Sequence, residues 1–138
     1  WRDDDMQQAL ENLLQKIVEN HRVDKTRIYV TGLSMGGYGT WSLAARRPDL
    51  FAAAVPICGG GDPATVNILK NMPIWVFHGG LDGVVLPEES EKMVRALERA
   101  GGKVRYTLYP KAYHDSWTET YDSPALYDWL LSNRKVEN

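Results

Sequence analysis

Four short runs of apolar, β-branched and aromatic residues recur along the chain, and helix-like segments alternate with them. The runs cover residues 27–31, 52–58, 73–78 and 104–108, and their composition is typical of β-strands. The second run is apolar at every position, as expected of a strand buried on both faces of a parallel sheet. Because strands that alternate with helices form parallel sheets with helical crossovers, we expect an α/β fold with about four parallel strands and flanking helices.

The helical segments are recognised by their periodicity and by the residues at their ends. In residues 4–20, apolar side chains recur at the i, i+3, i+4 and i+7 spacing of one helix face. Pro48 ends one later segment, and Gly101–Gly102 ends another. The expected helices cover residues 4–20, 35–46, 64–71, 87–100 and 123–131.

Length, charge and cysteine content limit the classes of protein to which the chain can belong. The length of 138 residues predicts one domain, covering residues 1–138. The net charge of the chain is −2. Because no run of like charge exceeds Asp3–Asp5, we expect no nucleic-acid partner, and no apolar stretch approaches the ~20 residues of a membrane span. Cys58 is the single cysteine, which excludes an internal disulfide and a cysteine-rich zinc site. A start at Trp1 without a signal peptide indicates a processed, truncated or excised chain. A cytoplasmic location is favoured for the chain as given, although the sequence leaves it open.

Residues Gly32–Gly36 read GLSMG and match the pattern G-x-S-x-G between an expected strand and an expected helix. This context is typical of a nucleophile elbow, in which a strained turn lifts a serine hydroxyl from the edge of the sheet. Glycines on both flanks are expected to avoid Cβ clashes. Ser34 is therefore the candidate nucleophile, and the N–H of Met35 at the helix start is the first candidate donor to an oxyanion. The alternative is an ordinary glycine-rich turn that holds a serine by chance.

A nucleophilic serine needs a base, and the chain has three histidines. His114 follows the last expected strand, where the histidine loop of a hydrolase with such an elbow belongs, and it is the candidate base. His21 lies at a helix end far upstream, where a solvated or capping role is the alternative. His78 ends a strand and is expected to support the loop that follows it.

The candidate acid is Asp82, on the loop after the third expected strand. It lies 48 residues after Ser34 and 32 residues before His114, so the three residues follow the order Ser, Asp, His that accompanies this elbow. Asp115 is a rival, but its place next to His114 makes a hydrogen bond to Nδ1 awkward. Asp62 is a third candidate, with capping of the following helical turn as the alternative.

With these residues the chain resembles the α/β-hydrolase superfamily, and within it the carboxylesterase, phospholipase and dienelactone-hydrolase-like branch. The resemblance implies a carboxylic ester hydrolase that uses Ser34, Asp82 and His114 as a triad, takes a small-molecule ester as substrate and needs no metal or organic cofactor. Dienelactone hydrolases proper use a cysteine nucleophile, so the serine at this position fits an ester-hydrolysing relative better. Cys58 lies on another strand and is expected to be a small buried apolar residue. The stretches that carry the resemblance are residues 24–41, 54–61, 73–85 and 109–117.

The chain departs from this superfamily at its N-terminal end. Members usually have eight strands with the elbow after the fifth, whereas one helix and no strand precede Arg27. The loop that supplies the second oxyanion donor in the family is missing, and the backbone at Gly59–Gly61 is a candidate substitute. The strand at 27–31 is therefore expected to form a sheet edge. In the family, the helices equivalent to 4–20, 35–46 and 87–100 pack on one face of the sheet, so only the last helix is left to cover the other face. We therefore expect either a homo-oligomer, most simply a C2 dimer through this edge or bare face, or a piece of a longer protein.

Substrate preference is weakly encoded in the sequence. Tyr38, Tyr113 and Trp117 lie near the elbow or the histidine loop and are candidates for an acyl or aryl pocket, whereas Trp41 is expected to be core on the elbow helix. Since no insertion is long enough for a sizeable lid, small or soluble esters are favoured over long-chain lipids. Two alternatives stay open: a catalytically incomplete fragment or subunit that acts by binding, and a prolyl-oligopeptidase-like peptidase.

Overall fold

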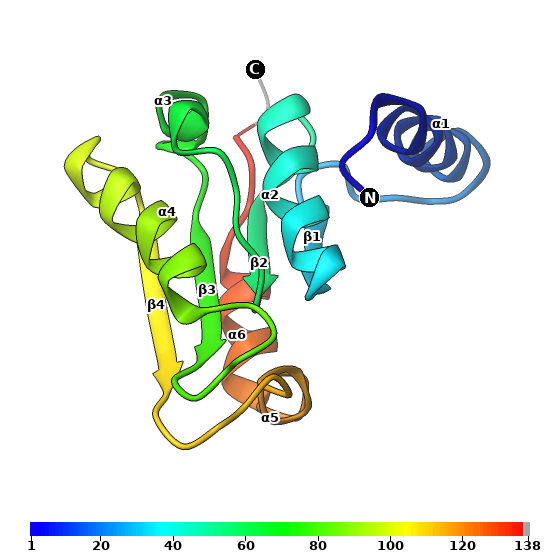
Figure 1. Cartoon of the computed structure of the whole chain (residues 1–138). Helices are drawn as coiled ribbons and strands as arrows, with labels where there is room; N and C mark the ends of the chain where they lie inside the picture. Colours follow the sequence, from blue (N-terminus) through cyan, green and yellow to red (C-terminus); the bar gives the residue numbers. More distant parts are fainter. Residues whose placement is uncertain (137–138) are drawn as a thin grey trace.

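The computed structural model describes residues 1–136 as a four-stranded sheet with helices on both faces (Figure 1). The strands lie in the order β1-β2-β3-β4, and all neighbours are parallel. The predicted α/β fold with four parallel strands is therefore confirmed. The elements are α1 (Asp4–Asn20), β1 (Tyr29–Leu33), α2 (Met35–Arg46), β2 (Ala53–Ile57), the 3-10 turn η1 (Pro63–Thr65), α3 (Val66–Leu69), β3 (Ile74–Gly79), α4 (Pro87–Arg99), β4 (Val104–Tyr109), α5 (Trp117–Tyr121) and α6 (Pro124–Ser132).

The boundaries of β1 differ from the expected ones by two residues. The sequence indicated a strand over 27–31, but Tyr29–Leu33 pair in register with Ala53–Ile57 of β2. The first two residues of the GLSMG motif therefore belong to the strand, and Ser34 follows it directly. This register brings the serine to the carboxyl edge of the sheet.

Alternate residues of β2 and β3 face opposite sides of the sheet, and both sides are buried. One apolar cluster joins the even-numbered strand residues to α2, α3 and α4, and the other joins the odd-numbered ones to α6. Burial on both faces explains the uninterrupted apolar run of β2, and each fully buried Val, Ile, Leu or Phe side chain contributes about 1.5–3 kcal/mol. The strand residues are Ala54, Ile74 and Val76 in the first cluster, and Ala53, Val55, Ile57, Trp75 and Phe77 in the second.

Helix α1 lies beside the β1 end of the sheet and not over a face with α2 and α4 (Figure 1). It contributes Leu14 to the first cluster, but Met6, Leu13 and Ile17 are exposed. The expectation that this helix lies on one sheet face together with α2 and α4 is therefore wrong. Arg46 of α2 holds the helix from outside through hydrogen bonds to three of its polar side chains.

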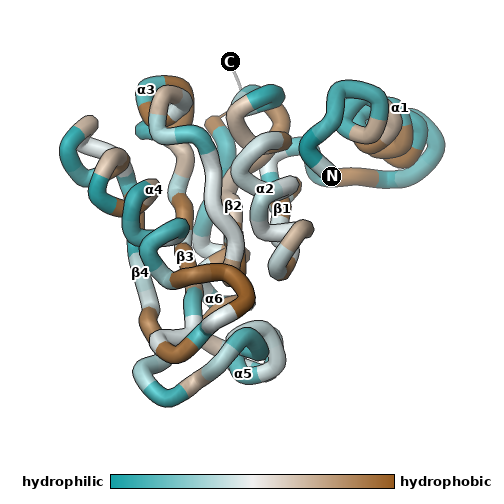
Figure 2. The backbone as a smooth tube through the Cα atoms, in the orientation of Figure 1, coloured by the Kyte–Doolittle hydropathy of each residue, from teal (hydrophilic) through white to brown (hydrophobic). Residues whose placement is uncertain are grey.

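Within residues 1–136, β1 pairs with β2 alone and so forms one edge of the sheet. A hollow of about 590 Å³ runs along this edge between α1 and α2 and reaches Ser34. Trp1, Leu10 and Leu43 are among the apolar side chains that line it. Figure 2 shows hydrophobic residues along β3 and in the segment that leads into α4, whereas β4 is mostly pale. None of the helices in the described range has both the length and the apolarity that a membrane crossing requires.

Candidate active site

Ser34 occupies a sharp turn between β1 and α2. Its backbone has φ 54° and ψ −117°, and among non-glycine residues 1–136 only Ser34 and Cys58 have positive φ. Such a conformation costs about 1–3 kcal/mol and persists where neighbours hold it. The Ser34 N–H donates to the carbonyl of Ile57 at 3.0 Å, and the Ser34 carbonyl accepts from the N–H groups of Gly37 at 2.9 Å and Tyr38 at 3.1 Å. The turn is therefore the strained elbow that the motif predicts.

The glycines of the elbow have unequal roles. A Cβ at Gly32 would collide with the carbonyl of Gly36, and a Cβ at Gly37 would lie 2.5 Å from the carbonyl oxygen of Ile57. A Cβ at Gly36 would meet nothing within 4 Å. The expectation that both flanking glycines of the motif avoid a clash is thus correct for Gly32 and wrong for Gly36.

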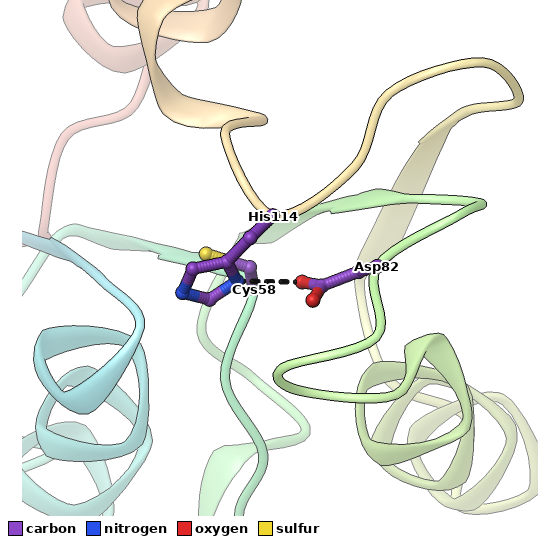
Figure 3. A group of neighbouring side chains, drawn as sticks. All are labelled: Cys58, Asp82 and His114. Atoms are coloured by element: carbon purple, nitrogen blue, oxygen red, sulfur yellow. Dashed lines mark hydrogen bonds and ion pairs between the residues drawn. The ribbon is translucent and has the colours of Figure 1, made fainter.

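The imidazole of His114 bridges Ser34 and Asp82. Its Nε2 lies 3.0 Å from Ser34 Oγ, and its Nδ1 lies 2.8 Å from Asp82 Oδ2; Figure 3 shows the ring edge facing the carboxylate. Because an ionised carboxylate only accepts, Nδ1 carries the proton, and Nε2 of the neutral ring is left to accept the Ser34 hydroxyl proton. The three residues predicted as nucleophile, acid and base are thus brought together at the carboxyl edge of the sheet.

The carboxylate of Asp82 is held ionised in a buried position. Its side chain has no exposed surface, and Oδ1 accepts from the backbone N–H groups of Val84 at 2.9 Å and Val85 at 3.0 Å. Burial alone raises the pKa of Asp82, but the hydrogen bonds from His114, Val85 and Val84 outweigh burial, and the pKa lies below its ordinary value. The negative charge is therefore available to orient the imidazole and to stabilise its protonated form.

The loop that carries His114, between β4 and α5, packs directly against the backbone at the end of β3, where Gly79 has no side chain. A Cβ at Gly79 would lie 2.6 Å from the carbonyl oxygen of Ala112, and the same oxygen accepts from the N–H of Leu81 at 2.9 Å. The indole of Trp117 then packs edge-on against the His114 ring, with centroids 5.4 Å apart and planes at 84°. Sequence reasoning did not assign Gly79 this role, although a glycine directly after a buried strand is a signal of close backbone approach.

Comparison with known proteins gives the family of the chain. A sequence profile of the Dienelactone hydrolase family matches residues 1–128. The chain belongs to this family. A putative carboxymethylenebutenolidase from Escherichia coli (strain K12) is 32% identical over 100 residues, which cover 66% of this chain and 37% of that protein. Poly(3-hydroxyalkanoate) depolymerase C from Paucimonas lemoignei is 44% identical over 52 residues, which cover 38% of this chain and 13% of that protein.

A solved structure agrees with this assignment to the dienelactone hydrolase family and its α/β-hydrolase fold. The crystal structure of a thermostable esterase superposes with a TM-score of 0.89 at 45% identity, covering 92% of this chain and 36% of that one. The chain therefore spans little more than a third of the esterase and of the carboxymethylenebutenolidase, and less of the depolymerase.

The other site residues predicted near the elbow are Met35, Gly59 and Tyr38, and they do not share one hollow. Met35 is the first residue of α2, where backbone N–H groups have no partner within the helix, and it lines the same hollow as Ser34. Gly59 lies beneath the elbow, where a Cβ would be 2.7 Å from the Ser34 carbonyl oxygen, and its own carbonyl accepts from Trp41 Nε1 at 3.2 Å. Tyr38 lines a separate hollow of about 340 Å³. Trp41 is 2% exposed and belongs to the core, as predicted.

The rival acids and one rival base have structural roles elsewhere. Asp62 caps η1 by accepting from the N–H of Ala64 at 2.9 Å, as its alternative interpretation predicts. Asp115 accepts from the backbone N–H of Thr118 at 3.0 Å, at the start of α5. His21 is exposed and closes the C-terminal end of α1.

Cys58 is fully buried, as predicted, but it also lies beside the elbow. Its sulfur accepts from the Ser34 N–H at 3.3 Å, and burial raises the pKa of its thiol. The sulfur and one ligand atom each from Asp82 and His114 lie within 4.8 Å of one another (Figure 3). These donor types suit zinc, but Asp82 and both nitrogens of His114 are engaged with each other and with Ser34. The cluster is therefore part of the same site and not a separate metal centre.

Proposed function

We propose that this chain is a serine esterase that hydrolyses small or soluble carboxylic esters. The proposal depends on one observation: His114 lies within hydrogen-bond distance of Ser34 Oγ on one side and of Asp82 Oδ2 on the other. Relatives named carboxymethylenebutenolidase and poly(3-hydroxyalkanoate) depolymerase, and the solved thermostable esterase, support ester hydrolysis as the reaction class.

In the proposed acylation step, His114 Nε2 takes the hydroxyl proton as Ser34 Oγ attacks the ester carbonyl carbon. The carbonyl π bond becomes a negative charge on oxygen, and the N–H of Met35 stabilises this charge. The tetrahedral intermediate then collapses, the bond to the alcohol oxygen breaks, and His114 gives its proton to the leaving alcohol. The product of this step is an acyl group on Ser34.

Deacylation repeats the same proton transfers with water. His114 takes a proton from a water molecule while the water oxygen attacks the acyl carbonyl carbon. The second tetrahedral intermediate then collapses, the bond from the carbonyl carbon to Ser34 Oγ breaks, and His114 returns the proton to Ser34 Oγ. Asp82 keeps the His114 tautomer correct in both steps and balances the imidazolium charge. The reaction converts ester and water into acid and alcohol, and we propose that no metal or organic cofactor takes part.

The proposal assigns one donor to the oxyanion, the N–H of Met35. Gly59, the candidate for the second donor, packs beneath the elbow, so it offers no support for that role. Loss of one oxyanion donor typically costs about 10²–10³ in kcat. We therefore expect slow ester hydrolysis by the isolated chain.

The test is hydrolysis of p-nitrophenyl butyrate by the 138-residue chain beside two serine variants. Ser34→Ala should reduce the rate to the uncatalysed level. Ser42→Ala, within α2 and away from the elbow, should retain the wild-type rate. A rate that persists in Ser34→Ala contradicts the proposal. Parallel assays with a p-nitroanilide test the alternative peptidase function, which requires cleavage of the amide at a comparable rate.

The open edge of β1 favours a second role, in which the chain acts as part of an assembly. Unpaired strand edges recruit further strands, and here the apolar hollow of about 590 Å³ runs beside the edge and opens at Ser34. We propose that a second copy of the chain covers this edge in a C2 dimer. Light scattering on the protein eluted from size-exclusion chromatography should give twice the mass of one chain. A monomeric mass without esterase activity would indicate that the chain acts only within a longer protein.

A further inference from the structure

We propose that His78 is a positioning residue that holds the acid of the triad in place, an inference that rests on the proposed function. His78 stands at the end of β3 and has no exposed surface. It does not touch Ser34 in the structure; its partners lie on the loop after β3 and on α4. Its effect on the reaction is therefore exerted through Asp82.

The ring nitrogens of His78 have defined roles. Nε2 lies 2.8 Å from the carbonyl oxygen of Val85 and 3.3 Å from Asp82 Oδ2. Both of these oxygens only accept, so Nε2 carries a proton. Nδ1 lies 2.6 Å from Ser90 Oγ, and in the neutral ring it accepts the hydroxyl proton of Ser90. The Gly59 carbonyl oxygen is a second, more distant acceptor for this hydroxyl at 3.4 Å. Ser90 of α4 thus favours the tautomer whose Nε2–H donates to the Val85 carbonyl and lies beside Asp82 Oδ2.

Val85 connects His78 to the carboxylate through both of its backbone groups. Its N–H donates to Asp82 Oδ1 at 3.0 Å, and its carbonyl accepts from His78 Nε2 at 2.8 Å. The His78 imidazole therefore holds the loop between β3 and α4 through its hydrogen bond to the Val85 carbonyl. Without the Nε2–H donor, the Val85 carbonyl loses this partner, and the residue whose N–H binds Asp82 Oδ1 is held less firmly.

The carboxylate of Asp82 is surrounded by donors on both oxygens. Oδ1 faces the N–H groups of Val84 and Val85, and Oδ2 faces His114 Nδ1 at 2.8 Å and His78 Nε2 at 3.3 Å. Three of these donors make hydrogen bonds to the carboxylate. The fourth, His78 Nε2–H, donates to the Val85 carbonyl and lies near Oδ2. Rotation of the carboxylate away from His114 would break contacts with the others, so the environment defines a single orientation.

The experiment compares His78→Asn with His78→Gln in the ester hydrolysis assay. The longer glutamine side chain carries its NH2 group close to the position of Nε2, whereas the asparagine NH2 group corresponds to Nδ1 and does not reach Val85. Because a misplacement of about 1 Å at a catalytic group costs about 10²-fold, we expect His78→Asn to lower kcat by about 10- to 100-fold with KM within about twofold. His78→Gln should restore kcat to within about threefold of the wild type. Ile74→Val, a buried change on the same strand, controls for loss of packing in β3.

A second measurement separates this inference from the proposed function. The His114 Nδ1 proton shared with Asp82 is expected to give a far-downfield proton NMR signal at low temperature, which His114→Gln should remove and thereby identify. We expect the signal in the wild type and in His78→Gln, and its shift or loss in His78→Asn. Equal kcat in the two His78 variants, or an unchanged signal in His78→Asn, overturns the positioning role. If the wild type does not hydrolyse esters, the proposed function fails, and the NMR comparison still decides the role of His78.

Discussion

Substituting alanine at two adjacent glycines of α2 tests whether backbone contact at the elbow controls both stability and catalysis. Gly36 and Gly37 lie in the first turn of the same helix, so each substitution carries a similar gain in helix propensity, up to about 1 kcal/mol. A Cβ at Gly36 meets nothing within 4 Å, whereas a Cβ at Gly37 lies 2.5 Å from the Ile57 carbonyl oxygen. The two variants therefore differ mainly in one backbone clash.

The magnitude of that clash follows from the distances. Real Cβ contacts essentially never fall below 3.0 Å, and ordinary contact begins at 3.4 Å, so Gly37→Ala must separate α2 from β2 by about 0.5–0.9 Å. Overpacking of this kind costs typically about 1–3 kcal/mol, which corresponds to a fall in Tm of about 4–12 °C for a chain of this size. The displaced carbonyl of Ile57 is also the acceptor for the Ser34 N–H. Since about 1 Å of misplacement costs about 10²-fold in rate, we expect a loss of kcat of several tens of fold.

Thermal unfolding by circular dichroism and hydrolysis of p-nitrophenyl butyrate measure the two effects. Gly36→Ala should keep its activity and raise Tm by up to about 4 °C. The reasoning is refuted if Gly37→Ala matches the wild type in both Tm and kcat, or if Gly36→Ala is the more damaging of the two.

Three further predictions concern charge and packing around the site and at α1. The depressed pKa of Asp82 means that its charge stabilises the fold above the ordinary carboxyl pKa of about 3.9. This contribution is lost as the pH falls through the lower folded value, so Asp82→Asn should flatten the fall in unfolding free energy below about pH 4; an unchanged slope in acid titration of stability contradicts this. Trp117→Ala removes an edge-on aromatic contact with His114 worth about 0.5–1.5 kcal/mol. It should lower kcat by about 2- to 13-fold, whereas Trp117→Phe should retain most of the rate. Arg46→Ala breaks the exposed contacts with α1 and should speed amide hydrogen exchange in α1 while leaving Tm almost unchanged; unaltered exchange would show that α1 is held by Leu14 and not by charge.

The prediction of the fold from sequence was accurate where a pattern reports directly on burial. The apolar run of β2 indicated a strand covered on both faces, and the structure places α2 to α4 on one face and α6 on the other. The same approach failed for α1, because periodicity shows that a helix has an apolar side but not that the chain supplies a surface for it. Leu13 and Ile17 carry the pattern and remain exposed.

The candidate site divides in the same way. The elbow around Ser34 was recognisable because its strain, its glycines and its helix start lie within a few consecutive residues. The need for Gly37 and the freedom at Gly36 were not predictable, because the deciding atom is the Ile57 carbonyl of another strand. The position of Cys58 beside Ser34 likewise depends on the pairing of β1 with β2.

By itself, the sequence determined that strands alternate with helices, that a serine stands at a strained strand-to-helix turn, and that Asp82 and His114 follow later strands in the expected order. These are properties of neighbouring residues, and local sterics and hydrophobic periodicity express them directly. Tertiary structure alone decided the hydrogen bonds among Ser34, His114 and Asp82 and the role of His78 behind them. Those contacts join loops up to 80 residues apart, and their geometry is set by the order and register of four parallel strands, because only the assembled sheet brings the carboxyl ends of those strands to one edge.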